Sequence, residues 1–493
     1  MREAELTQPP LSAASVFEER ARRFAALLRR HLALVVLVGA ALVLRVIALV
    51  AIYPGIWFSD TNEYLQVATT GRLSFVRVQG YALLVAPFLH LGSAGALIVL
   101  QHLMGLAIVM ILYALLLRRG VSRWIAFFAV LPAALDAYVI DLEHMIMAET
   151  FFHLLLVGAF AVLLWRERVR PYEAAAGGLL LGYAGITRSV AIPFAVLFLG
   201  YLLVRRVGLY PVLAFGLGWA LVVGGYLTMF KIQHGEFAFT RYQGRFLYAK
   251  TATFANCEEL GDLPADERAL CPRSTPRYTS NGFLWGKGSP IHGVPLSEDG
   301  RIRDFALRVI RHEPLTYLKV VVRDTIHYFE PAHQTGWNDY SDTAWQFPAD
   351  PRHWKYPGYR GPIRAGRADR VHDIDPSQYV NPMVGQPRLN VPASKVLHYY
   401  QRVFFTSGQV LAACLLVVLA ALIRRRPRTF RLRLDASLLA ACALTALVVS
   451  SALSIFDFRY GLVAVIFLPV AAALAGSTFL GRQDPAAPPA TGS

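Results

Sequence analysis

The chain has 493 residues, of which 55% are hydrophobic and only 17% are charged, and its formal net charge is +16. Soluble domains have about 25% charged residues, and disordered chains are poorer in apolar residues, so both classes are excluded. Nucleic-acid-binding proteins of this basicity are rarely so apolar, which leaves a membrane protein with several spans.

The predicted elements begin with residues 1–31, which are polar and rich in arginine. They indicate a cytosolic lead-in, because the apolar run that follows is too long for a cleaved signal and has no small-residue cleavage site. A spanning helix needs about 20 apolar residues, and a search for such runs predicts an all-α polytopic membrane protein with about ten transmembrane helices. These are 32–53, 94–117, 124–140, 145–165, 174–187, 190–204, 210–230, 403–423, 434–455 and 461–480.

The remaining segments complete the predicted organisation. Residues 32–230 form a first membrane module with seven spans, an outer loop at 54–79, and a short apolar run at 80–92 that predicts an interfacial or re-entrant helix. Residues 403–480 hold the last three spans, and the Pro/Ala-rich tail 481–493 is predicted to be disordered.

The segment 231–402 is too polar and too rich in Pro and Gly to cross a membrane, and we predict that it lies outside the cell. Cys257 and Cys271 lie fourteen residues apart in it and predict a disulfide, because the outer compartment is oxidising. Residues 304–329 predict an amphipathic helix pair around Pro314, either on the membrane or against the spans. The stretch 337–359 carries Trp337, Trp345 and Trp354, which suit either sugar stacking or the membrane interface.

The arginines orient the chain. With a cytosolic N-terminus, inside segments hold most of them, as the positive-inside rule requires. They lie within 20–30, 118–123, 166–170, 205–206 and 424–433. The short outside segments hold only Arg72, Arg77, Arg188 and Arg459. We therefore predict a plasma-membrane protein with both termini in the cytoplasm, and no nucleic-acid partner.

Acidic residues and arginines meet at the same predicted membrane edge, where ionisable groups are costly and so are candidates for function. The outer face holds Asp60 and Glu63 in the first loop, the turn Asp141–His144, Glu149, Arg188 and Arg459. Carboxylates suit a general base, and arginines suit a phosphate. Structural alternatives remain open: a capping box at 59–63, solvated acids at 141 and 143, an interhelical hydrogen bond at 149, and snorkelling arginines.

Several short motifs follow one another along the membrane segments. Arg45 in the first span leads to Asp60-x-x-x-Tyr64. Arg77 and Gly80-Tyr81 precede Pro87; Glu149-Thr-Phe-Phe opens the fourth span; Thr187-Arg188 ends the fifth; and Arg459-Tyr460 precedes Pro469. In this order they resemble the GT-C superfamily of polytopic glycosyltransferases, in its branch of protein O-mannosyltransferase-like and aminoarabinose transferase-like enzymes. Two positions depart from the branch: Thr61 stands where Glu is usual, and Ala82 where Pro is usual.

The resemblance implies transfer of a sugar from a polyprenyl-phosphate donor to a hydroxyl of a glycan, lipid or protein on the outer face, with inversion. Asp60 would be the general base. The donor phosphate would bind Arg77, Arg188 and Arg459, with Tyr81 and Tyr460 as hydrogen-bond donors. The sugar or acceptor would contact a further set: Glu63, Tyr64, Asp141, Glu143, His144 and Glu149. No cofactor is required, although a divalent cation beside Asp60 is compatible with the carboxylates.

Two other functions compete with transfer. A transporter or flippase of a polyprenyl-linked or anionic precursor would place its charges near mid-membrane and favour inverted repeats. Here the charges gather at one edge and no repeat is found, so this alternative is weaker. A non-catalytic assembly partner would tolerate the loss of Asp60.

Overall fold

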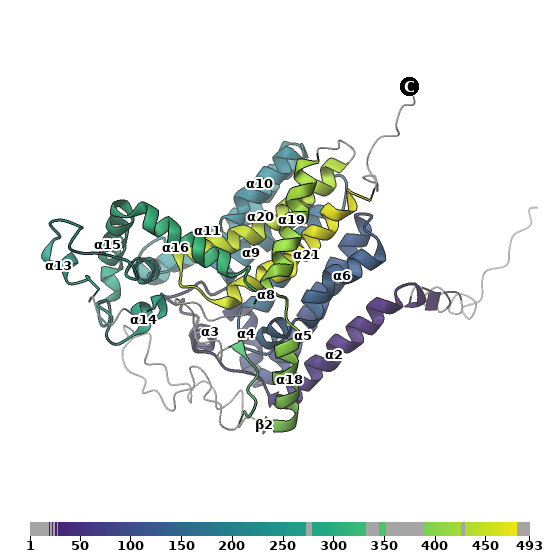
Figure 1. Ribbon diagram of the computed structural model, residues 1–493, viewed down its shortest axis with the longest axis horizontal. Coiled ribbons are helices and arrows are strands. Elements are labelled where there is room, and N and C mark those ends of the chain that lie inside the picture. The colour runs from purple at the N-terminus through teal and green to yellow at the C-terminus, as the bar shows by residue number, and fades with distance from the viewer. Residues whose placement is uncertain are drawn as a thin grey trace, which may run out of the picture.

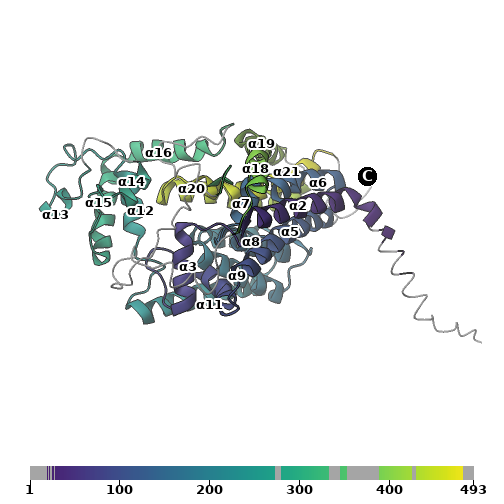
Figure 2. The ribbon, with the colours of Figure 1, turned by 90° about the horizontal axis from the view of Figure 1, so that it is seen from below.

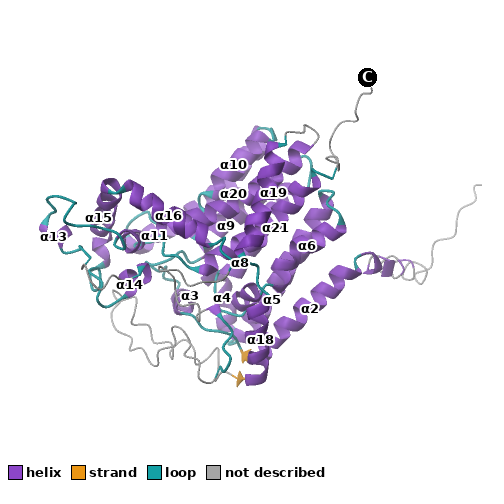
Figure 3. Ribbon diagram, viewed as in Figure 1, coloured by secondary structure: helices purple, strands orange, loops and turns teal. Residues whose placement is uncertain are grey.

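The computed structural model describes residues 28–272, 279–331, 345–351, 388–424 and 429–480, with a few residues between 19 and 26. Most of the predicted lead-in and the predicted disordered tail lie outside these residues, as do Trp337 and Trp354. The described part is mostly helical, and its one sheet pairs β1 (Ile52–Tyr53) with β2 (Arg388–Leu389) in antiparallel register. Figure 3 shows these two strands beside the foot of α18.

All ten apolar runs are helical, although 124–140 is divided into two helices, and together they build a bundle from which α12–α16 project to one side (Figure 1). The helices of the membrane segments are α2 (Leu32–Ala51), α4 (Gly80–His90), α5 (Ala94–Arg118), α6 (Arg123–Leu135), α7 (Ala137–Glu143), α8 (Glu149–Leu164), α9 (Pro171–Thr187), α10 (Phe194–Val204), α11 (Leu209–His234), α18 (Val391–Val403), α19 (Gly408–Ile423), α20 (Phe430–Leu453) and α21 (Leu462–Ser477). In Figure 2, α9 and α11 lie on one side of the bundle and α18, α19 and α20 on the other.

Five of the described helices are long and apolar enough to cross a membrane, and up to seven if each of two bent pairs counts as one span. The five are α2, α5, α11, α20 and the run Phe458–Ser477. The chain therefore has the helices of an all-α membrane protein, whereas the count of ten spans stays a prediction. The helices α8, α9 and α10 have 16, 17 and 11 residues, shorter than the length of about 20 that a perpendicular span needs.

The predicted span 124–140 is not one straight helix, because α6 and α7 meet at an angle of 51°. Asp136 causes the break. Its Oδ1 accepts hydrogen bonds from the backbone N–H of Tyr138 at 2.9 Å and Val139 at 3.3 Å, so it caps α7. Its Oδ2 accepts a third, at 2.6 Å, from the N–H of Thr406, which joins this break to the segment before α19.

The arginine-rich loops meet at one end of the bundle. Arg205, just after α10, donates to the carbonyls of Leu163 and Glu167 at 2.7 Å each, at the end of α8. The end of α10 therefore returns to the level where α9 begins, so α9 and α10 run in opposite directions and do not form one bent span. At the same end, Arg119 Nη2 lies 2.6 Å from Asp435 Oδ2.

The segment 231–402, which is predicted to lie outside the cell and which we call the outer segment, forms a second hydrophobic core around Tyr248, Phe283 and Phe305. Val76 and Ile455, which lie outside this segment in the sequence, also belong to this core. Its helices are α12 (Gln243–Thr251), α13 (Ala265–Arg268), α14 (Ser280–Trp285), α15 (Asp299–His312) and α16 (Pro314–His327), with a 3₁₀ turn at Leu296–Glu298. The predicted helix pair around Pro314 is confirmed as α15 and α16. The predicted disulfide between Cys257 and Cys271 is also present.

We expect loss of this disulfide to weaken the outer segment. Closing a loop of this length reduces the entropy of the unfolded chain, which is worth about 3 kcal/mol. Cys257→Ser should therefore lower the free energy of unfolding of the segment by that order, measured by protease susceptibility of the purified protein. Cys414→Ser, at a free cysteine of α19, is the control and should cleave like the parent. Equal protection of both variants would contradict a stabilising role for the disulfide.

Candidate active site

Asp60 lies at the start of α3 (Ser59–Thr70), the helix that follows the first predicted span. A capping box that uses Glu63 as its third helical residue requires Asp60 as the N-cap, but the N-cap is Phe58, two residues earlier, so this box is not formed. Thr61 Oγ1 instead accepts the backbone N–H of Phe58 at 3.1 Å and donates to the carbonyl of Ile146 at 3.0 Å. The side chains of Asp60 and Glu63 are thus free of capping and available to other groups.

The segment that carries Arg77 is held against the end of α9. Gly80 packs so closely there that a Cβ would lie 2.7 Å from the hydroxyl of Thr187. Tyr183 donates a hydrogen bond of 3.0 Å to the carbonyl of Gly80. This close approach of α4 to α9 brings Arg77 and Arg188 to the same end of the bundle.

Three arginines and four carboxylates form one continuous chain of contacts, which we call the arginine–carboxylate cluster. Its members are Glu63, Arg77, Asp60, Arg459, Asp457, Glu149 and Arg188. The cluster joins α3, the loop before α4, the start of α8, the end of α9 and the turn before α21. All of them except Asp457 are predicted site residues, and the structure brings these six together with it.

Asp60 is the centre of the cluster. Its Oδ2 contacts Nη1 of Arg77 and, at 2.9 Å, Nη1 of Arg459. Arg77 also reaches Glu63, with Nε 2.7 Å from Oε2. Each of the two arginines that contact Asp60 therefore also contacts another carboxylate.

Arg459 links Asp60 to the rest of the cluster. Its Nε lies 2.9 Å from Asp457 Oδ2, and its Nη1 lies 3.5 Å from Glu149 Oε1. The same oxygen of Glu149 contacts Nη1 of Arg188. A second oxygen of Glu149, Oε2, is buried without a hydrogen-bond partner in the described part of the chain.

Burial and charge act in opposite directions on these groups. Burial alone would raise the pKa of Asp60, but the guanidinium groups of Arg77 and Arg459 hold it below its usual value. Burial raises the pKa of Glu63, and the negative charge of Asp60 adds to that rise against the effect of Arg77. With every group ionised, four carboxylates against three guanidiniums leave one excess negative charge, so an anion can enter only if a carboxylate moves or takes up a proton.

Aromatic rings surround the guanidinium of Arg459. It lies 5.4 Å from the ring centre of Phe58, 5.0 Å from Trp345 and 5.2 Å from Tyr460. Arg188 lies 5.0 Å from the same Tyr460 ring. Trp345 belongs to the predicted aromatic stretch, so the outer segment contributes one wall of the site. Cation–π contacts in such a partly desolvated place favour the charged guanidinium by about 1–2 kcal/mol each.

Tyr64 and Tyr81 lie beside the cluster but are not directed at its arginines. Their rings meet edge to face, with centres 4.9 Å apart. The hydroxyl of Tyr81 donates to Gln101 Oε1, and the amide of Gln101 donates to the carbonyls of Glu143 and Met145 at 2.8 and 2.6 Å. Tyr81 therefore supports the wall of the site in this conformation rather than offering a donor to a phosphate.

The predicted turn Asp141–His144 is not solvated; residues 141–143 lie inside α7 and are buried. Glu143 receives two hydrogen bonds from Arg45, Nε to Oε2 at 2.8 Å and Nη2 to Oε1 at 2.7 Å. His102 bridges Glu143 Oε2 at 3.0 Å and His144 Nδ1 at 3.1 Å. Glu143 and His144 are therefore held by groups of α2 and α5 and do not join the arginine–carboxylate cluster.

The separation of this second group has a simple cause. Arg45 is an ionisable residue in the middle of the first span, and it needs a buried partner. A Cβ on Gly105 would overlap the carboxylate of Glu143, so the glycine makes room for that partner. Asp141 is likewise buried, and neither of its carboxylate oxygens has a hydrogen-bond partner within the described residues.

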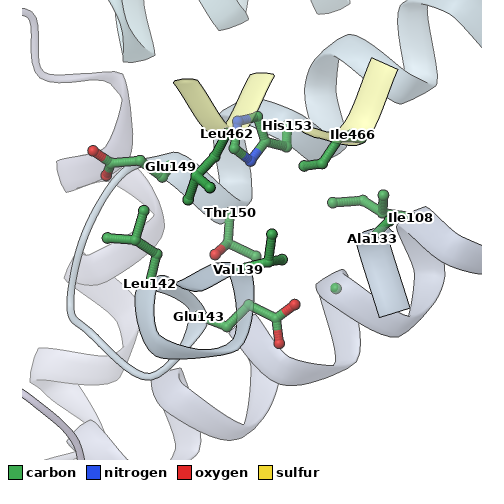
Figure 4. A pocket seen from close by; sticks show the side chains of 11 residues that line it. Ile108, Ala133, Val139, Leu142, Glu143, Glu149, Thr150, His153, Leu462 and Ile466 are labelled. Atoms are coloured by element: carbon green, nitrogen blue, oxygen red, sulfur yellow. The ribbon is translucent and has the colours of Figure 1, made fainter. Parts of the chain in front are cut away.

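Two hollows adjoin the cluster, with about 300 and 260 Å³ of empty space when their mouths are included. Figure 4 shows the first, which is lined by Glu149, Thr150 and His153 of α8 and by Glu143 of α7. The second is lined by polar groups of the cluster together with Ser450, Tyr460 and His153. Each hollow has only about 10 Å³ that a water-sized sphere can enter, room for about one water molecule, so substrate binding requires side chains to move.

Two ionisable residues of the site, His153 and Asp457, are not among the predicted site residues. His153 is 4% exposed and lines both hollows. Its position four residues after Glu149 puts the two on one face of α8, and this spacing was the available signal. Asp457 stands two residues before the Arg459-Tyr460 motif, but its contact with that arginine depends on the turn between α20 and α21.

No group of three or more His, Cys, Asp or Glu side chains suited to a metal ion occurs among the residues that the structure describes. No family model matches the chain, and neither a curated protein nor a solved structure is similar to it.

The turn residue Asp457 provides a pH test of the cluster. Burial raises its pKa to about 6, against the lowering effect of Arg459. The folded state therefore binds a proton more tightly than the unfolded state and loses stability as the pH rises from about 4 to about 6. The Asp457→Asn variant should not show this loss of stability with rising pH. The Tm of the variant relative to that of the parent should therefore increase between about pH 4 and about pH 6 and stay constant at higher pH.

Thermal unfolding in detergent at several pH values measures this difference. Glu63 also has a raised pKa and adds a slope of the same sign, but it does so in both proteins and cancels. Parallel pH profiles of the two proteins would contradict the burial of a titrating carboxyl at 457.

Proposed function

We propose that this protein is an inverting glycosyltransferase that moves a sugar from a polyprenyl-phosphate donor to an acceptor hydroxyl. One observation carries the proposal: a buried carboxylate, Asp60, shares a site at one end of the bundle with three arginines, of which Arg77 and Arg459 contact it directly and Arg188 is linked through Glu149. A base beside an anion-binding group is what transfer from a lipid phosphate requires. The order of motifs that resembles the GT-C superfamily supports the same reaction.

In the proposed reaction, Asp60 accepts the proton of the acceptor hydroxyl while its oxygen attacks the anomeric carbon. The bond between that carbon and the phosphate oxygen breaks, and the electron pair leaves with the polyprenyl phosphate. Arg77, Arg188 and Arg459 stabilise the charge that develops on the phosphate. Glu149 holds Arg188 in place. Attack on the face opposite the leaving group inverts the anomeric centre.

In the substrate-free protein Asp60 is a weak base, because two guanidiniums favour its charged form. A donor phosphate would compete for Arg77 and Arg459 and so withdraw their charge from Asp60. The pKa of Asp60 would then rise towards the range in which a carboxylate accepts a proton efficiently. The base would thus gain strength only when the donor is bound.

The same geometry supports the proposed sidedness. The arginine-rich loops gather at one end of the bundle, and the cluster lies at the other. Positive charge retained in the cytoplasm would place the cluster outside the plasma membrane and both termini inside, with ten spans if the short helices also cross. Acceptors there are glycans, lipids or proteins of the cell envelope.

The test is to incubate purified protein in lipid nanodiscs with a panel of polyprenyl-phosphate sugars and candidate acceptors. We expect one donor to be consumed, with polyprenyl phosphate released and an inverted linkage in the product. Consumption of none, together with translocation of a labelled lipid across vesicles that contain the protein, would overturn transfer in favour of a flippase.

A further inference from the structure

An exposed apolar stripe runs along the whole of α16. Its members are Leu315, Leu318, Val322 and Ile326, which are 71%, 55%, 45% and 57% exposed. Spacings of three and four residues put all four on one side of the helix. On the opposite side Val320, Val321 and Asp324 are buried. A stripe of this length on an otherwise packed helix indicates a surface that is covered in the working protein.

Contacts near the two ends of α16 show that this helix lies across one end of the bundle. Near its start, the hydroxyl of Tyr317 donates to the carbonyl of Ala452 at 2.9 Å, at the end of α20. Just beyond its other end, Tyr328 donates to the carbonyl of Asp457 at 3.1 Å, before α21. The carbonyl of Glu330 then accepts the N–H of Gly408, the first residue of α19, at 3.1 Å. The helix therefore runs past the ends of three membrane helices at one level.

Exposed apolar side chains also lie on the neighbouring helix α20. Figures 1 and 2 show α16 at the edge of the outer segment, next to α20. On the neighbouring end of α20, Val448 and Leu453 are 44% and 56% exposed. A buried ion pair fixes α16 in this position, since Lys250 Nζ lies 2.6 Å from Asp324 Oδ2 and joins the helix to α12.

Exposed cations flank the stripe. Lys319 and Arg323 lie one turn apart on its edge, and Arg311 and His312 precede the helix. Arg323 also contacts Asp324, at 3.1 Å, but Asp324 keeps Lys250 as its buried partner. An apolar stripe bordered by basic residues is the pattern of a helix that lies in a membrane interface.

We propose that α16 docks on the lipid surface, with its stripe at the boundary of headgroups and acyl chains and with Lys319 and Arg323 on lipid phosphates. This docking would hold the turn before α21 at headgroup level, because Tyr328 also packs on Phe456, with ring centres 4.6 Å apart. Arg459 follows that turn. Arg459 would then lie at headgroup level, where the phosphate of a carrier lipid is found; this step rests on the proposed function. The docking of α16 does not depend on the proposed function.

Spin labels on the full-length protein in nanodiscs test the docking. Leu318→Cys and Val322→Cys place labels on the stripe, and Asp304→Cys places a matched label on the exposed side of α15; Cys414 and Cys442 are first replaced by serine. We expect the stripe labels to lie about 5–10 Å below the lipid phosphates, accessible to oxygen and not to a water-soluble nickel complex. The label at 304 should show the reverse.

Two results would overturn the docking. One is a stripe label as open to the nickel complex as the label at 304. The other is a stripe label closed to both reagents, which would mean that protein, such as a second copy of this chain, covers the stripe. Both readouts are independent of glycosyl transfer.

The cations are tested by the double variant K319Q/R323Q with a label at 318. In nanodiscs that contain phosphatidylglycerol, we expect the label to move towards water relative to the same label on the parent helix. In phosphatidylcholine alone, the difference between the two should be smaller. An equal depth in all four samples would overturn the contact of these cations with lipid phosphates.

Discussion

Replacing Asp60 with asparagine should reduce transfer by about 10²–10⁴-fold, the usual contribution of a general base. The amide keeps the size of the side chain but cannot take the proton. Because Arg77 keeps Glu63 and Arg459 keeps Asp457 as partners, the fold should persist. The variant should also bind the anionic donor more tightly than the parent, since two guanidiniums lose a competing carboxylate.

Turnover and donor affinity, measured separately in nanodiscs, distinguish these effects. Glu63→Gln is the matched control, because this neighbour on α3 shares Arg77 but not Arg459. It should lose much less activity. Normal turnover by Asp60→Asn would reject Asp60 as the base, and a parallel loss in both variants would mean that α3 as a whole, not one proton acceptor, had been disturbed.

The helical fold could be predicted from the sequence because apolar runs are local signals. All ten runs are helical, with only 124–140 divided into two helices, and the disulfide follows from two cysteines in a segment that cannot span. The break at Asp136 was missed, although an aspartate in an apolar run is a capping signal. Its second carboxylate oxygen binds Thr406, a residue 270 positions away, and such a partner cannot be read from the run itself.

The site was predicted in part, and for a physical reason. Residues at the same ends of the predicted spans, such as Asp60 and Arg459, share one depth in the membrane however the helices pack side by side. The predicted topology alone therefore brings them near each other. Whether Glu143 joins them depends on which cation it meets inside the bundle. Glu143 pairs with Arg45 of α2, whose Nη2 lies 2.7 Å from Glu143 Oε1. This contact depends on helix packing and on the absence of a side chain at Gly105.

Arg459 is the residue whose loss should affect both folding and transfer. It contacts the carboxylates of Asp60, Asp457 and Glu149 and lies among three aromatic rings. Arg459→Gln would leave buried carboxylates uncompensated, and removal of one partner from a buried ion pair costs about 3–5 kcal/mol. We expect a lower unfolding temperature in detergent together with loss of donor binding.

Because instability alone could explain that result, Arg459→Lys separates the two roles. The ammonium keeps the positive charge, so most of the stability should return. It cannot offer the paired N–H groups that grip a phosphate, so turnover should remain lower by about 10²–10³-fold. Arg119→Lys is the matched control, because Arg119 is equally buried and pairs with Asp435 at the opposite end of the bundle. It should transfer at the parental rate per folded molecule. If Arg459→Lys were as active as that control, the guanidinium at 459 would have only a structural role, and the donor phosphate would have to bind elsewhere.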